Sequence, residues 1–179
     1  WSSCSTATSF TITEPDSLTC NFTTTNVSCY GENSGSAIVN FFGGTTGSAN
    51  LDTNYILSWD TLLYILPFPY TVFTTPIGVP AGVYPFSATD LNGCSIYDTI
   101  TITQADSLYT AYTLTDYSGY NISCNGYNNA TVDVQINGGT SPFTHYFDGN
   151  IITNNPIQNL GAGIFTDSII DANNCIHSN

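Results

Sequence analysis

The chain carries an internal repeat, whose blocks recur in the same order and at the same spacing. Residues 27–31 (VSCYG) recur as 122–126 (ISCNG), and residues 37–45 recur as 132–140, both ending in Gly-Gly-Thr. The cysteine of the first block lies 15 residues before the second glycine of the Gly-Gly pair in both copies. A fixed order and spacing of this kind is typical of tandem domains built from one supersecondary unit.

Two more blocks repeat further along the chain. Residues 80–84 correspond to 161–165, and residues 90–94 correspond to 171–175. Gly82 lies 12 residues before Cys94, and Gly163 lies 12 residues before Cys175. Between the Gly-Gly-Thr block and this pair, the first copy is longer by 14 residues. We interpret the extra residues as an insertion at about 48–78.

A third, partial copy opens the chain. Residues 4–18 parallel residues 94–108 at a constant offset of 90. We therefore interpret residues 1–20 as the closing strand of a preceding repeat and as a candidate donor strand. Residues 21–108 are then the first repeat, and residues 109–179 are a second repeat that lacks its closing strand.

The local pattern predicts strands rather than helices. Residues 99–103 (TITIT) and 131–136 (TVDVQI) alternate polar and apolar side chains, which is the period of a strand with one buried face. Gly-Gly, Asn-Gly and Asn-Asn pairs supply turns every ten residues or so. The sequence predicts an all-β chain with an antiparallel β-sandwich of about seven strands in each repeat.

Charge excludes two classes of partner. The chain has no Lys or Arg and 13 Asp plus Glu residues, a formal net charge of −13. Binding to nucleic acid and to anionic membranes both depend on cationic side chains, so we expect neither. Six cysteines without metal-site spacing favour an extracellular, oxidising environment.

The repeat suggests how four of the cysteines pair. Cys29 in the first repeat is equivalent to Cys124 in the second, and Cys94 is likewise equivalent to Cys175. The simplest interpretation is one disulfide within each repeat. These disulfides, Cys29 to Cys94 and Cys124 to Cys175, would each stabilise the fold by about 3–5 kcal/mol.

Cys4 and Cys20 are left over. They pair with each other in one interpretation, and in another Cys4 links to a neighbouring copy. Zinc binding is the competing use of the cysteines, but there is no Cys-x-x-Cys and there are only two histidines. We expect no metal site of this kind.

In this order, the blocks resemble the SprB repeat, a family found in very large cell-surface proteins of gliding Bacteroidetes-type bacteria. Departures are the 14-residue insertion, the extra Cys20, and Asn174 where the first repeat has Gly93. The resemblance implies tandem Ig-like or PKD-like sandwiches, export by the type IX route, and a role in surface filaments or adhesion. Such repeats resemble spacers rather than catalysts, so it implies no active-site residue.

The layout of the repeats suggests a mode of assembly. A sandwich without its closing strand exposes an edge and an apolar groove, which a spare strand from another chain can fill. Head-to-tail donation of this kind does not close on itself and builds a filament. The alternative is that the ends are arbitrary cuts in a continuous array. The expected partners are copies of the chain or neighbouring repeats.

Glycans are a further expected attachment, because several sites fit the Asp-(Ser/Thr)-apolar pattern that resembles O-glycosylation in Bacteroidetes. The alternative is that they are ordinary turn and strand residues. The candidate acceptors are Ser17, Thr61, Thr99, Ser107 and Ser168.

The aromatic insertion supports a second hypothesis, a carbohydrate-binding module. Its candidate ligand residues are Tyr64, Phe68, Tyr70 and Phe73, although such residues more often pack on the sheet. Bound Ca²⁺ would suit an acidic chain, but no Asp-x-Asp-x-Asp-Gly loop occurs.

Two other features of the sequence bear on chemistry. Asp90 and Asp171 are better explained as residues that fix a turn than as metal ligands. His145 and His177 lack a recognisable acid partner and nucleophile, so we expect no enzyme and no cofactor.

Overall fold

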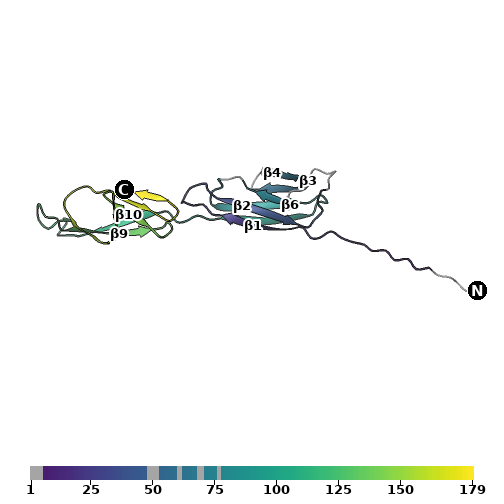
Figure 1. Cartoon of the computed structure of the whole chain (residues 1–179), viewed down its shortest axis with the longest axis horizontal. Coiled ribbons are helices and arrows are strands. Elements are labelled where there is room, and N and C mark those ends of the chain that lie inside the picture. The colour runs from purple at the N-terminus through teal and green to yellow at the C-terminus, as the bar shows by residue number, and fades with distance from the viewer. Residues whose placement is uncertain (1–5, 48–52, 60–61, 68–70, 76–77) are drawn as a thin grey trace, which may run out of the picture. The chain divides into compact units, whose positions relative to one another are not determined.

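The fold is all-β. The computed structural model describes residues 6–47, 53–59, 62–67, 71–75 and 78–179, which form strands and no helix (Figure 1). No helix long and apolar enough to cross a membrane is therefore found among these residues. The strands are β1 Thr19–Thr25, β2 Ser36–Phe42, β3 Thr53–Trp59, β4 Leu62–Pro67, β5 Val72–Thr74, β6 Gly82–Thr89, β7 Ser95–Ile102, β8 Tyr109–Leu114, β9 Ala130–Asn137, β10 Thr144–Phe147, β11 Asn150–Ile152, β12 Ile157–Leu160, β13 Asp167–Ile170 and β14 Ile176–Ser178.

One arrangement of seven strands occurs twice along the chain. In the first repeat the sheets run β1-β2-β5 and β4-β3-β6-β7, and in the second they run β8-β9-β12 and β11-β10-β13-β14. The ladders match residue by residue, because Leu57 faces Ala88 across β3 and β6 just as His145 faces Ile169 across β10 and β13. The predicted all-β sandwich fold is confirmed.

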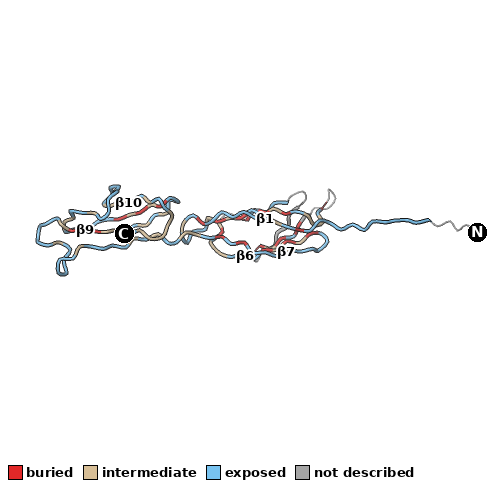
Figure 2. The backbone as a smooth tube through the Cα atoms, turned by 90° about the horizontal axis from the view of Figure 1, so that it is seen from below, coloured by how far each residue is buried: buried red, intermediate tan, exposed pale blue. Residues whose placement is uncertain are grey.

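Alternation along the strands produces the core. In β2 the side chains of Ala37, Val39 and Phe41 are buried, and in β9 every second residue from Ala130 to Val134 is buried. The Phe41 ring contacts Tyr55, with ring centroids 5.0 Å apart. Figure 2 shows the buried stretches lying within the strands. The period-2 segments of the sequence therefore became strands with one buried face, as predicted.

The 14-residue difference between the repeats lengthens elements and adds none among the described residues. β3 has seven residues where β10 has four, and β4 has six where β11 has three. The insertion thus extends the β3–β4 hairpin.

The Gly-Gly-Thr block recurs because it makes a turn that only glycine fits closely. Gly43 and Gly44 have φ angles of 68° and 67°, a region unfavourable to residues with a side chain. A Cβ at Gly43 would lie 2.2 Å from the Ser17 carbonyl oxygen, and one at Gly138 would lie 2.0 Å from that of Ser107. The Asp-Ser-Leu blocks at residues 16–18 and 106–108 therefore recur because their backbone packs on this turn.

Contacts divide the chain into two compact units. The first comprises Trp1–Thr23, Ala37–Thr74 and Val83–Ile100, and the second comprises Thr24–Ser36, Thr75–Gly82 and Thr101–Asn179. Two loops that the sequence places in the first repeat, 24–36 and 75–82, thus belong to the second unit.

The segment before β1 is extended and exposed. Residues 6–17 form no strand, and all are exposed (Figure 2). Phe10 and Ile12 are each 86% exposed, an unusual state for large apolar side chains. Only the end of the segment contacts the first unit, where the backbone N–H of Gly44 donates to the Asp16 carbonyl at 2.8 Å and Leu18 is buried.

Candidate assembly site

An open groove lies in the second unit. Its volume is about 1080 Å³, and its walls are mainly apolar, with Asp167 and several Asn residues also in the lining. The loop that carries Cys124 also lines it. The apolar lining consists of Tyr112, Leu114, Tyr120, Ile122, Tyr127, Ala130, Val132, Phe147, Leu160, Ala162 and Phe165.

The equivalent place in the first repeat is occupied by Ile102 of β7. A Cβ built on Gly35 would lie 2.7 Å from Ile102 Cγ2 and 3.3 Å from Val27 Cγ2, so these residues are in close contact. After the strand, the Val27 N–H donates to the Thr103 carbonyl at 2.9 Å. Ile102 is only 1% exposed. The closing strand therefore completes the core at this point.

The two places correspond residue by residue. Gly35 pairs with Val79 in an isolated antiparallel bridge, and Ala130 pairs with Leu160 in the same way between β9 and β12. Val27 and Val79 are 3% and 8% exposed, whereas their equivalents in the second repeat, residues 122 and 160, are only half-buried. β14 has three residues where β7 has eight. The groove is therefore the place that the end of β7 fills in the first repeat.

Segment 6–18 corresponds in sequence to the segment that fills this place in the first repeat. At the offset of 90, Phe10 is equivalent to Ile100 and Ile12 to Ile102, and both isoleucines are buried. The exposed apolar side chains of the segment thus match the two buried side chains of β7.

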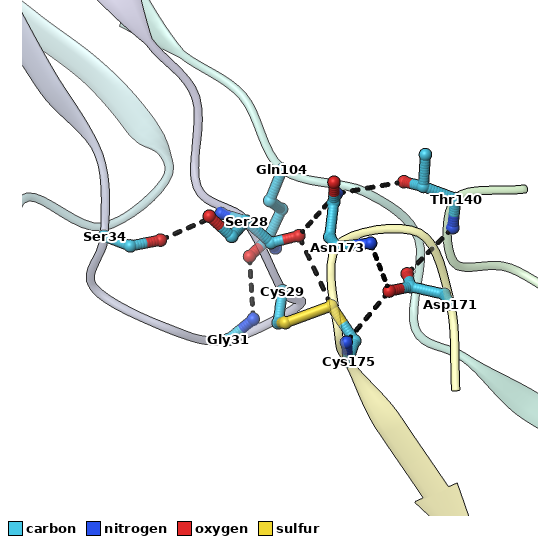
Figure 3. Close-up of a disulfide and its surroundings, with 9 residues drawn as sticks. All are labelled: Ser28, Cys29, Gly31, Ser34, Gln104, Thr140, Asp171, Asn173 and Cys175. Atoms are coloured by element: carbon cyan, nitrogen blue, oxygen red, sulfur yellow. Dashed lines mark hydrogen bonds between the residues drawn. A yellow bond between two sulfur atoms is a disulfide. The ribbon is translucent and has the colours of Figure 1, made fainter. Parts of the chain in front are cut away.

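The disulfide differs from the predicted pairing. Cys29 is bonded to Cys175 (Figure 3). Among the described residues, Cys20, Cys94 and Cys124 are free. The predicted pairs Cys29–Cys94 and Cys124–Cys175 are therefore wrong. Burial, and then the nearby Asp98 carboxylate, raise the pKa of the Cys20 thiol. Cys4 lies outside the described residues.

The reason for the error is that a repeat identifies equivalent cysteines, but does not say whether the partner is in the same repeat or the next. The observed bond joins the 27–31 loop of the first repeat to the 171–175 turn of the second, and both lie in the second unit. Asn173 Nδ2 also donates to the Ser28 carbonyl at 3.0 Å (Figure 3). These bonds explain why the contacts assign residues 24–36 to the second unit.

The aspartate turns, defined as residues 90–94 and 171–175, have the predicted role. Asp90 Oδ1 accepts hydrogen bonds from the N–H groups of Asn92 and Cys94, and its Oδ2 accepts one from Thr45 N–H at 2.7 Å. Asp171 accepts the three equivalent bonds. The interpretation of both residues as turn-fixing is confirmed.

Burial would raise the pKa of Asp90, but the hydrogen bonds from the Thr45, Cys94 and Asn92 N–H groups outweigh it and hold the pKa below its usual value. Asn174, where the first repeat has Gly93, has a φ of 64°, a conformation that Asn tolerates better than most residues.

The candidate aromatic platform is not assembled by the described residues. Phe73 is 6% exposed and its ring packs 6.3 Å from that of Trp59, so it belongs to the core and a ligand cannot reach it. Its assignment as a ligand aromatic is therefore wrong. Tyr64 lies in β4, and Phe68 and Tyr70 lie outside the described residues.

The candidate glycan acceptors are scattered. Ser17, Thr99 and Ser107 are exposed, Ser168 is half-buried, and Thr61 lies outside the described residues. Glycosylation at these sites stays a prediction.

Sequence reasoning missed one polar pair. His145 Nε2 contacts Asp167 Oδ1, and Tyr112 donates to Asp167 Oδ2 at 2.9 Å. The expectation that His145 lacks an acid partner is thus wrong. By strand register the pair replaces Leu57 and Phe86 of the first repeat. No His, Cys, Asp or Glu group suited to a metal ion occurs among the residues described.

Comparison with known proteins agrees with the repeat. The family model of the SprB repeat matches residues 21–52, which span most of β1, the Cys29 loop and β2. No curated protein matches the chain. SprB repeats are associated with cell-surface repeat proteins of adhesin type, a structural family. The match at residues 21–52 supports the resemblance of the chain to the SprB-repeat family.

Proposed function

We propose that the chain is a non-enzymatic, structural segment of an extracellular surface filament or adhesin, and that its copies join head-to-tail by strand donation. In this proposal the donor segment, residues 6–18 of one chain, lies in the groove of another. The observation that carries it is that the first repeat buries Ile102 at the place where the second repeat has a groove.

The apolar contacts support this choice of occupant. Phe10 and Ile12 would move from almost full exposure into contact with Ile122 and Leu160. Burying a large apolar side chain contributes about 1.5–3 kcal/mol, so two such residues offer a substantial driving force. The polar residues between them would face away, as the alternating residues of β7 do.

A polar contact supports the register. In the first repeat the Gly31 N–H donates to Gln104 Oε1 at 2.8 Å, directly after the closing strand. Glu14 occupies the position of Gln104 in the donor segment. Its carboxylate would accept the same bond from Gly126, the equivalent of Gly31.

The length of the connection supports the geometry. Leu108, which precedes β8, lies five positions after Thr103, and Leu18, which precedes β1, lies five positions after Thr13. A donated segment would therefore enter the next chain as the closing strand of the first repeat enters the second. Because the donor and the groove are different surfaces, this contact does not close on itself and builds a filament.

Sedimentation of the full chain over a range of concentrations tests the proposal. We expect assemblies that grow with concentration. The double variant Phe10→Asp/Ile12→Asp should remain monomeric, because two carboxylates cannot be buried in an apolar groove without a partner.

The matched control is Ser9→Asp/Thr11→Asp, which adds the same charge on the other face of the segment. It should still assemble. A parent chain that is a folded monomer at every concentration would refute strand donation, as would equal behaviour of the two variants.

A further inference from the structure

Two exposed cysteines of the chain are free, and each is equivalent to one partner of the observed disulfide. Cys124 occupies the position of Cys29, and Cys94 occupies the position of Cys175. The chain therefore has one disulfide between its two repeats, and two free cysteines at the positions that a second such disulfide would use.

The cysteine loops, residues 27–31 and 122–126, have the same conformation with and without a disulfide. The Cys29 carbonyl accepts from Glu32 N–H at 3.1 Å, and the Cys124 carbonyl accepts from Tyr127 N–H at 3.1 Å. The N–H of the preceding serine is bonded to a side chain six residues later in both loops. The free Cys124 loop therefore already has the conformation of the disulfide-bonded Cys29 loop.

The aspartate turns also match. Asp90 N–H donates to the Cys94 carbonyl at 3.0 Å, and Asp171 N–H donates to that of Cys175 at 3.0 Å. Asn92 Nδ2 donates to Thr45 Oγ1 at 2.8 Å, as Asn173 donates to the equivalent threonine. Asn173 makes one more bond, to the Ser28 carbonyl of the cysteine loop. The turn at Cys94 therefore has the same hydrogen-bonding groups as the turn at Cys175, which contacts a cysteine loop.

The observed bond obeys a simple rule: the loop cysteine of one repeat pairs with the turn cysteine of the next. In the head-to-tail assembly, the repeat that comes after Cys124 is the first repeat of the next chain. We propose that Cys124 of one chain forms a disulfide with Cys94 of the next, so that a covalent bond locks each junction. This inference rests on the proposed strand donation.

The reaction is an exchange with a small-molecule disulfide such as oxidised glutathione. The Cys124 thiolate attacks one sulfur of the small disulfide and releases one small thiol. The Cys94 thiolate of the next chain attacks the Cys124 sulfur of the mixed disulfide and releases the second small thiol. The two protein thiols are oxidised, one small disulfide is reduced, and the two protons end on the released thiols.

The test uses the full chain with Cys4→Ser and Cys20→Ser, which removes the other thiols. It is incubated with oxidised and reduced glutathione, then examined by sedimentation and by denaturing electrophoresis without reductant. We expect a ladder of covalent multimers that reductant removes. Mass spectrometry after chymotrypsin digestion should find Cys94–Cys124 peptides and an intact Cys29–Cys175 bond.

Adding Cys94→Ser or Cys124→Ser should abolish Cys94–Cys124 peptides and the long ladder, while sedimentation still shows assemblies. If the parent sediments as assemblies without Cys94–Cys124 bonds, the inference fails and strand donation stands. If the parent neither assembles nor forms these bonds, both fail. Covalent products joined mainly as Cys94–Cys94 or Cys124–Cys124 also contradict the inference, because the junction pairs unlike halves.

Discussion

The first and second repeats share one strand order but differ at one edge. In the first repeat, β7 places Ile102 against Val27 and the 27–31 loop is held by a disulfide. In the second, Ile122 and Leu160 line an open groove and the Cys124 loop is free. The second repeat therefore has the same strand order with a three-residue β14, and in our proposal a donated strand supplies the contacts that the end of β7 makes in the first repeat.

The comparison also separates the contacts that hold a repeat together from those that join repeats. The Gly-Gly turns and aspartate turns are alike in both repeats, and so depend on residues close by. The disulfide instead joins the first repeat to the second, and the burial of Ile102 depends on the closing strand, which is shorter in the second repeat. Variants at these two kinds of position should therefore differ in the size of their effect.

Removing the disulfide should have the largest effect on stability. It closes a sequence separation of 146 residues, for which the chain-entropy model gives about 5 kcal/mol as an upper value. We expect Cys29→Ser/Cys175→Ser to lower the free energy of unfolding by most of this, measured by urea denaturation. Cys94→Ser/Cys124→Ser, measured on the monomeric chain, should change it by less than about 0.5 kcal/mol. Equal losses of stability in the two double variants would contradict the division between the bonded and the free cysteines.

Shortening a buried side chain of the closing strand should lower the free energy of unfolding by less than removing the disulfide. Ile102→Ala removes buried methyl groups from a close-packed site and should lower the free energy of unfolding by about 2–5 kcal/mol. The matched change Ile12→Ala, at an exposed position, should leave the unfolding of the monomer unchanged and weaken assembly instead. A large loss of monomer stability from Ile12→Ala would mean that the segment already packs within its own chain.

The aspartate turn should respond to pH. The pKa of Asp90 is lowered in the fold, so its stabilising contribution is present above the unfolded-state value of about 3.9 and is lost as pH falls through the folded value. Asp90→Asn should cost about 1–3 kcal/mol at neutral pH, because one amide oxygen cannot accept all three bonds. Denaturation at several pH values checks this, and a cost that persists fully at pH 2 would contradict it.

The smallest effect is expected at the one residue that distinguishes the two turns. Asn174 has a positive φ, which glycine adopts without penalty. Asn174→Gly should therefore change stability by less than about 1 kcal/mol, whereas Gly93→Val should destabilise clearly, as β-branched residues avoid this region. Thermal unfolding of both variants makes the comparison, and a large loss from Asn174→Gly would show that the Asn side chain has another role.

Much of the fold could be predicted from sequence because it depends on local patterns. The alternation at 131–136 became β9, and Asp90 and Asp171 fix turns as expected. The disulfide could not be predicted, since equivalence between Cys29 and Cys124 leaves the partner's repeat undetermined. Phe73 was misread because an aromatic residue in an insertion has the same sequence signature in a core as on a surface.

The candidate site was predicted in outline only. The offset of 90 between segment 4–18 and β7 suggested a donor, but the groove depends on how Ile122, Ala130 and Leu160 come together from three parts of the chain. The His145–Asp167 pair was missed because its members lie 22 residues apart and meet only through the β10–β13 ladder.

Mixing two defective chains tests strand donation most directly. Phe10→Asp/Ile12→Asp keeps the groove and loses the donor, while Ile122→Asp/Leu160→Asp keeps the donor and loses the groove. Each should sediment alone as a folded monomer of 19.2 kDa, and their equimolar mixture should form a dimer of twice that mass and nothing larger. A mixture that remains monomeric, with both chains folded by circular dichroism, would contradict strand donation.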